Sequence, residues 1–98
     1  MLIVLAKITA KNDMADNILK ESKAIIEATR AEEGCIDYTL YNSTEEKDVL
    51  LFVEKWESKE FLDSHLKQQH FIDFGAAIEN YLAKDLEISV YSSEEITL

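Results

Sequence analysis

The stretch VLLFVEKW, residues 49–56, carries the strongest indication of the fold, because its first five residues are all apolar. A strand covered on both faces reads as a continuous apolar run, whereas a strand with one face in water alternates apolar and polar residues. The stretch LIVLA, residues 2–6, is equally continuous, while residues 35–41 and 85–91 alternate. These patterns predict four strands, and the two apolar ones, 2–9 and 49–56, are expected to form the centre of one sheet.

Three helices are predicted between the strands, from apolar or small residues that recur every three or four positions. The longest runs from Ala15 to Thr29; Asn12 or Asp13 is expected to cap its start and Gly34 to end it. The two shorter helices follow a cap at Ser58 and present Phe61, Leu62, His65 and Leu66 on one face of the first and Phe71, Phe74, Gly75, Ile78 and Leu82 on one face of the second.

The predicted order is strand, helix, strand, strand, helix, helix, strand. This is the split βαβ plan of ferredoxin-like α+β folds, in which the first and third strands are the central pair. A length of 98 residues corresponds to one domain, residues 1–98. The sequence therefore predicts a single α+β domain of ferredoxin-like βαββααβ topology.

A homodimer is predicted because the helices of this plan cover only one face of the sheet. The other face of the central strands is also apolar and would stand in water in a monomer. Burying several such side chains contributes on the order of 10 kcal/mol, at about 1.5–3 kcal/mol each. A second sheet stacked on this face would bury them, and Val4 or Leu5 together with Leu51 or Val53 are expected in the contact.

Composition excludes some classes of partner. Acidic residues number 20 and basic residues 10, for a net charge of −10. Nucleic acids and anionic membranes both select basic surfaces, so neither is an expected partner.

Cys35 is the only cysteine, which excludes a disulfide framework and a cysteine metal cluster. The apolar run at the N-terminus is too short for a signal peptide or a membrane span, so we expect a cytoplasmic protein.

Glu54 and His65 are the leading candidates for chemistry. Glu54 shares a pleat face with Leu50 and Phe52, and His65 lies on the apolar stripe of its helix, so both are expected to face the gap between sheet and helices. Such a pair could move a proton. It could also be a satisfied polar pair that locks the helix to the strand, and the residues alone leave both readings open.

His70 is a second candidate. Five residues of a continuous helix turn through about 500°, which would separate the side chains of His65 and His70. The two could converge only if the helix breaks around residues 67–69, and with Glu54 they would then mimic a two-His, one-carboxylate iron site. The spacing is no recognised metal motif, and neither a phosphate loop nor a dinucleotide fingerprint is present. We therefore predict no metal and no cofactor.

Three further residues are expected near the gap. Tyr38 faces the same way as Ile36 and Leu40, so its hydroxyl either reaches a pocket or is hydrogen-bonded in the core. Trp56 is expected in the core or in a pocket wall. Cys35 is expected to act as a small buried hydrophobe rather than as a reactive thiol.

Three stretches together resemble a known family. They are EGCIDY at residues 33–38, EKWESKE at 54–60 and HLKQQHF at 65–71. In order and spacing they are similar to the antibiotic biosynthesis monooxygenase family, especially its small quinol-monooxygenase-like and autoinducer-2-degrading members. The resemblance spans the whole chain. One departure is Gln69, which stands where a proline commonly precedes the second histidine of the family.

The resemblance implies a dimeric α+β barrel with one pocket per subunit, between sheet and helices. Many members oxidise quinols or electron-rich aromatics with O₂ and use neither metal nor flavin. The site residues that the resemblance implies are Tyr38, Glu54, His65 and His70, with Trp56 and Phe71 as pocket walls.

These lines together predict a cofactor-independent monooxygenase for a small quinol or electron-rich aromatic, with His65 and Glu54 as its acid–base pair. Two alternatives stay open, an isomerase of a small hydroxy-ketone and a dimeric module that binds a small molecule without turnover. A phosphorylated hydroxy-ketone would need a cationic anchor, for which Lys7, Lys23 and Lys55 are candidates.

Overall fold

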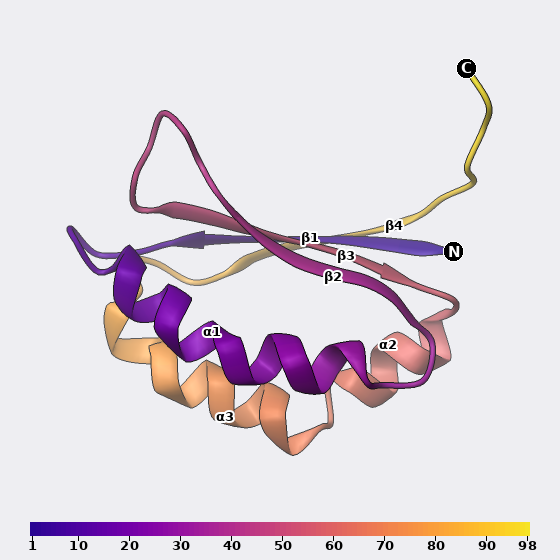
Figure 1. Cartoon of the computed structure of the whole chain (residues 1–98), viewed down its shortest axis with the longest axis horizontal. Helices are drawn as coiled ribbons and strands as arrows, with labels where there is room; N and C mark the ends of the chain where they lie inside the picture. Colours follow the sequence, from indigo (N-terminus) through magenta and orange to yellow (C-terminus); the bar gives the residue numbers. More distant parts are fainter.

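One antiparallel sheet of four strands carries every helix on the same face (Figure 1). The computed structural model describes residues 1–98. The elements, in chain order, are β1 Leu2–Thr9, α1 Ala15–Arg30, β2 Cys35–Asn42, β3 Val49–Trp56, α2 Lys59–His65, α3 Gln69–Ile78, the short 3₁₀ helix η1 Glu79–Tyr81 and β4 Glu87–Ser92. The strand order is β2-β3-β1-β4. The predicted ferredoxin-like α+β fold, with β1 and β3 at its centre, is confirmed.

The core lies between the sheet and the helices, and strand alternation decides which side chains enter it. In β3, every second residue from Leu50 to Trp56 is buried and the residues between them are partly exposed. The inward side chains of β1 and β3 meet Ile18 and Ile25 of α1 and Phe74 of α3. Glu54 is part of this inward row, so the sheet itself delivers a carboxylate to the apolar layer.

The first helix spans Ala15–Arg30, close to the predicted range, but its predicted capping residues are wrong. Its N-cap is Met14, with no side-chain capping bond, because Asp13 adopts a left-handed φ of 63° and pairs with Lys47 instead. Its last residue is Arg30, well before Gly34. Gly34 does take a left-handed φ of 82°, but there it shapes the entry into β2 rather than the helix end.

Two further boundaries differ from the prediction. Leu82 lies outside the helix, in extended backbone, because η1 tightens the end of α3 and Ala10 then forms a β-bridge with Leu82. The last strand is Glu87–Ser92 rather than 85–91.

Ile36 is half-exposed rather than inward-facing, since a bulge shifts the register between Cys35 and Asp37. Ser58 is the N-cap of α2, as predicted.

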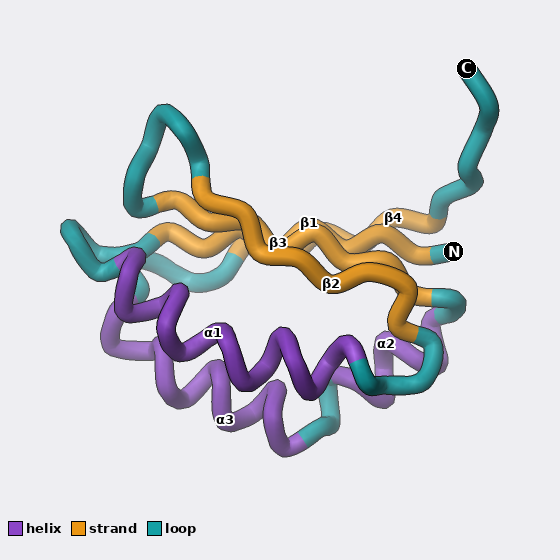
Figure 2. The backbone as a smooth tube through the Cα atoms, in the orientation of Figure 1, coloured by secondary structure: helices purple, strands orange, loops and turns teal.

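The face of the sheet away from the helices is open, as Figure 2 shows from the backbone. Leu5, Leu51 and Val53 alternate with inward residues and lie on this face, partly exposed. Val4 is buried on the helix side and lines its cavity, so it cannot take part in a contact across the open face. No helix is both long enough and apolar enough to cross a membrane.

Candidate active site

A cavity of about 130 Å³ lies between the sheet and the helices, and most of its lining is apolar. Its polar lining residues are Tyr38, Glu54 and His65. Ile88 and Val90 of β4 also line it and are each about half-exposed, so the cavity meets the surface along this edge of the sheet. For scale, an apolar protein cavity of roughly 150 Å³ holds one benzene molecule. The space therefore suits a single aromatic ring.

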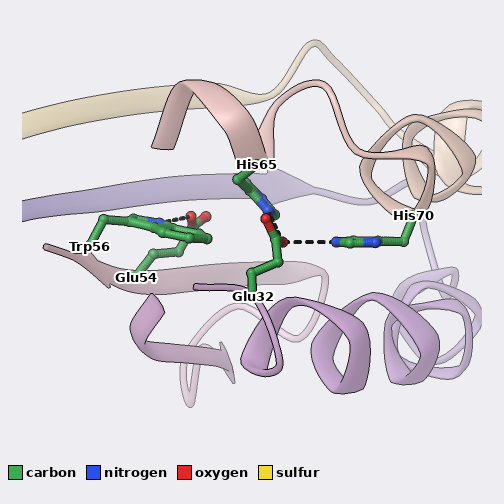
Figure 3. A network of polar contacts seen from close by, with 5 residues as sticks. All are labelled: Glu32, Glu54, Trp56, His65 and His70. Carbon is green, nitrogen blue, oxygen red and sulfur yellow. Dashed lines mark hydrogen bonds and ion pairs between the residues drawn. The ribbon is translucent and has the colours of Figure 1, made fainter. Parts of the chain in front are cut away.

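The two histidines converge on one carboxylate oxygen, as Figure 3 shows. Helix α2 ends at His65, Gln68 takes extended backbone angles, and α3 begins at Gln69. The helix is therefore broken between the two histidines, which allows their side chains to converge. Glu32, in the loop after α1, accepts both hydrogen bonds at Oε2. The distances are 2.7 Å from Nδ1 of His65 and 2.8 Å from Nε2 of His70.

The predicted hydrogen-bonded pair of Glu54 and His65 is wrong, because each of the two side chains has a different partner. Glu54 Oε1 accepts a hydrogen bond of 3.0 Å from Nε1 of Trp56, two residues along the same face of β3. Both side chains are buried, and the indole proton satisfies the carboxyl where His65 was expected. The carboxylate on His65 is Glu32 instead, although Glu54 and His65 still line the same cavity.

Glu32 sets the tautomer of His65. A carboxylate only accepts, so Nδ1 of His65 carries a proton, and in the neutral ring Nε2 holds the free lone pair. Burial lowers the pKa of His65 below its usual value, which the nearby Glu32 charge opposes. The ring centroids of Trp56 and Phe71 lie 4.8 and 5.2 Å from that of His65 and hold it in place. The site thus presents an oriented, neutral imidazole.

Glu54 titrates close to neutral pH. Burial raises its pKa from 4.5 to about 7, the hydrogen bond from Trp56 works against this shift, and the charge on Glu32 adds to it. A carboxyl with this pKa can hold or release a proton under physiological conditions. Buried carboxyls of this kind are common at catalytic sites.

The raised pKa predicts a pH-dependent stability difference between the wild type and Glu54→Gln. A carboxyl whose pKa is higher in the folded state binds more protons there, so stability falls as the pH rises from 4.5 through 7. Glutamine keeps the acceptor for Trp56 but does not ionise. We expect equal unfolding free energies at about pH 4.5, and the variant to be more stable by about 3 kcal/mol at about pH 8. Urea unfolding of both proteins at both pH values measures the difference in unfolding free energy. The same difference between variant and wild type at about pH 4.5 and at about pH 8 would contradict the raised pKa.

The other predicted site residues divide into two groups. Tyr38 and Phe71 line the cavity, and burial raises the pKa of Tyr38 above its usual range, so its hydroxyl stays protonated. Trp56 and His70 do not line the cavity: Trp56 lies behind the His65 ring, and His70 lines a separate surface depression. Burial raises the pKa of Cys35 to about 11, which keeps the thiol protonated and inert.

Glu32 is the residue of the candidate site that sequence reasoning missed. It sits in a loop beside another glutamate, outside any apolar periodicity, and is separated by more than thirty positions from both histidines. No spacing rule connects an acidic loop residue to two histidines on later helices. Only the packing of the loop against α2 and α3 joins them.

Comparison with known proteins agrees with this architecture. A sequence model of the antibiotic biosynthesis monooxygenase family matches residues 1–77. The chain belongs to this family. The family assignment covers β1 to α3, and therefore every polar residue described above.

Individual proteins are similar to this chain over most of its length. An uncharacterized protein of Synechocystis is 33% identical over 94 residues, which are 96% of this chain and 64% of that protein. A conserved protein of Methanosarcina mazei has a crystal structure that is similar at a TM-score of 0.90 and 32% identity, over 95% of this chain and 92% of that one. A crystal structure of an antibiotic biosynthesis monooxygenase is similar at a TM-score of 0.89 and 25% identity, over 97% of this chain and all of that one.

Proposed function

We propose that this chain is a cofactor-independent monooxygenase that oxidises a small, single-ring quinol or another electron-rich phenol with O₂. The observation that carries the proposal is the imidazole of His65, which lines an apolar cavity while Glu32 holds its Nδ1 proton. Since Nδ1 is occupied, Nε2 is the nitrogen left to act on a ligand in the cavity. Membership of the monooxygenase family supports the reaction class.

The proposed chemistry begins with proton transfer. His65 takes the hydroxyl proton of the bound quinol through Nε2, and the resulting phenolate is electron-rich enough to reduce O₂. One oxygen atom enters the ring, the other leaves as water, and the substrate supplies all four electrons, so hydroquinone and O₂ give a hydroxyquinone and water. Glu54 would exchange the second proton, and Tyr38 and Phe71 would hold the ring.

The charge distribution disfavours one alternative, the isomerase of a phosphorylated hydroxy-ketone. Such a substrate needs a cationic anchor, yet none of Lys7, Lys23 and Lys55 lines the cavity, and no arginine does. The polar lining of the cavity consists of Tyr38, Glu54 and His65, and the last two can be neutral near pH 7, which suits an uncharged phenol.

Oxygen consumption tests the proposal directly. A panel of single-ring hydroquinones and methoxyphenols, compared with two-ring and three-ring quinols, is screened on an oxygen electrode with mass spectrometry of the products. We expect O₂ uptake and a gain of one oxygen atom for the single-ring compounds. Substrate conversion without O₂ would indicate an isomerase, and binding without conversion a silent module; either result would overturn the monooxygenase.

The proposed assembly is a homodimer across the open face of the sheet, and Leu51→Asp is expected to disrupt it. In a twofold interface each substitution occurs twice. Losing this apolar contact therefore weakens the free energy of dimerisation by roughly 3–6 kcal/mol, which raises the dissociation constant more than a hundredfold. Light scattering at micromolar concentration should give a dimer mass for the wild type and a monomer mass for the variant.

Ile72→Asp is the matched control for the assembly experiment. Ile72 is a half-exposed apolar residue on α3 and does not line the cavity, so this variant should keep the dimer mass. A monomeric wild type, or dissociation in both variants, would remove the open face as the interface.

A further inference from the structure

Two histidines in different surroundings share one oxygen of Glu32. The side chain of His65 is 1% exposed and lines the cavity. That of His70 is 24% exposed and lines a separate depression of the surface, together with Glu21 and Asp73. One imidazole thus belongs to the cavity and the other to the solvent side.

The wall between the two spaces is apolar. Ile25 and Phe74 line both the cavity and the depression, and neither side chain can carry a proton. The hydrogen bonds that His65 and His70 both donate to Glu32 form a polar connection across this wall (Figure 3).

Charge couples the two rings. Their centroids are 6.1 Å apart, and one carboxylate between them balances one imidazolium. At an effective dielectric constant of about 20, a second imidazolium at this distance is disfavoured by about a hundredfold. The other titratable groups nearby are Tyr38 and Glu54 in the cavity, Glu21 and Asp73 in the depression with His70, and Glu33 and Glu60 beside Glu32.

We propose that His70 is the proton-exchange residue of the site, which releases a proton to solvent when His65 takes one from a bound phenol. This proposal rests on the proposed function. The O–H bond of the phenol breaks and its proton binds Nε2 of His65. The Nδ1–H bond of His70 breaks and that proton passes to water in the depression, while Nε2 of His70 keeps its hydrogen bond to Glu32. The cluster holds one extra proton before and after the step.

The coupling can be measured without any substrate, by NMR titration of the ring nitrogens of both histidines. His70→Gln keeps an N–H donor for Glu32 but cannot exchange a proton. We expect the titration midpoint of His65 to rise by about two pH units in this variant, equivalent to the hundredfold coupling. Ile72→Ala, a change at an exposed residue of α3 that lines neither the cavity nor the depression, should leave the midpoint unchanged. A His65 midpoint within a few tenths of a unit of the wild type in His70→Gln would overturn the proposal.

Proton release on ligand binding gives a second test, with 4-nitrophenol as the probe. At about pH 6, where histidine is largely protonated in water, bound phenolate is followed by its absorbance and released protons by an indicator dye. The wild type should release about one proton per phenolate formed, and His70→Gln close to none. Equal release by both proteins would contradict the role of His70. Failure of the wild type to bind the phenol would contradict the proposed function, while the NMR titration still decides the coupling.

Discussion

Replacing His65 with glutamine is expected to lower turnover of a single-ring hydroquinone by about 10²–10⁴-fold, the usual contribution of a general base. Glutamine keeps an N–H donor for Glu32, so the local hydrogen bond survives while the basic nitrogen is lost. The loss should appear in kcat, because the substrate still binds in the same apolar cavity. Oxygen uptake at saturating substrate measures it.

Thermal and urea unfolding of the same variant separate catalysis from structure. If His65 only locked the helices to the sheet, its loss would lower the unfolding free energy by about 1–3 kcal/mol and leave the specific activity of the folded protein intact. Lys67→Ala, an exposed change in the turn between α2 and α3, should match the wild type in both measurements. Full activity with reduced stability in His65→Gln would make His65 structural.

Gly34→Ala is expected to destabilise the fold by about 2–5 kcal/mol. A left-handed φ of 82° accounts for about 1–2 kcal/mol of this, because a Cβ meets the following carbonyl oxygen. The added Cβ would also lie 2.1 Å from Cγ and 2.6 Å from Cβ of Phe61, positions near the backbone of α2 that cannot swing away. Overpacking of this kind adds about 1–3 kcal/mol.

Gly75→Ala provides a matched control of opposite sign. Gly75 lies inside α3, and nothing stands within 4 Å of a Cβ placed there. Alanine in a helix interior is favoured over glycine by about 0.5–1 kcal/mol, so this variant should be slightly more stable. Urea midpoints measured at one protein concentration compare the two variants, and similar midpoints would show that the contact with Phe61 yields easily.

The backbone plan follows from short-range patterns in the sequence. Continuous apolar runs in 2–6 and 49–53 predict the central strands, because such runs are typical of strands at the middle of a sheet, whereas strands with one face in water alternate. The apolar stripe of α1 is equally local, since helix periodicity alone decides which side chains point inward. The inward direction of Glu54 and His65 follows in the same way, from alternation along a strand and from position on a helix.

The partners of these groups were decided only by tertiary structure. Periodicity gives the direction of a side chain but not what stands opposite it. The sequence therefore predicts a pair of Glu54 and His65, whereas the hydrogen-bond partner of Glu54 is Trp56 on its own strand. The break after His65 depends on how α2 and α3 pack, which local propensity does not fix. Glu32 reaches both histidines because a loop closes over the ends of two helices. Contacts between segments far apart in the chain leave no period in the sequence, and this carboxylate could be found only in the folded molecule.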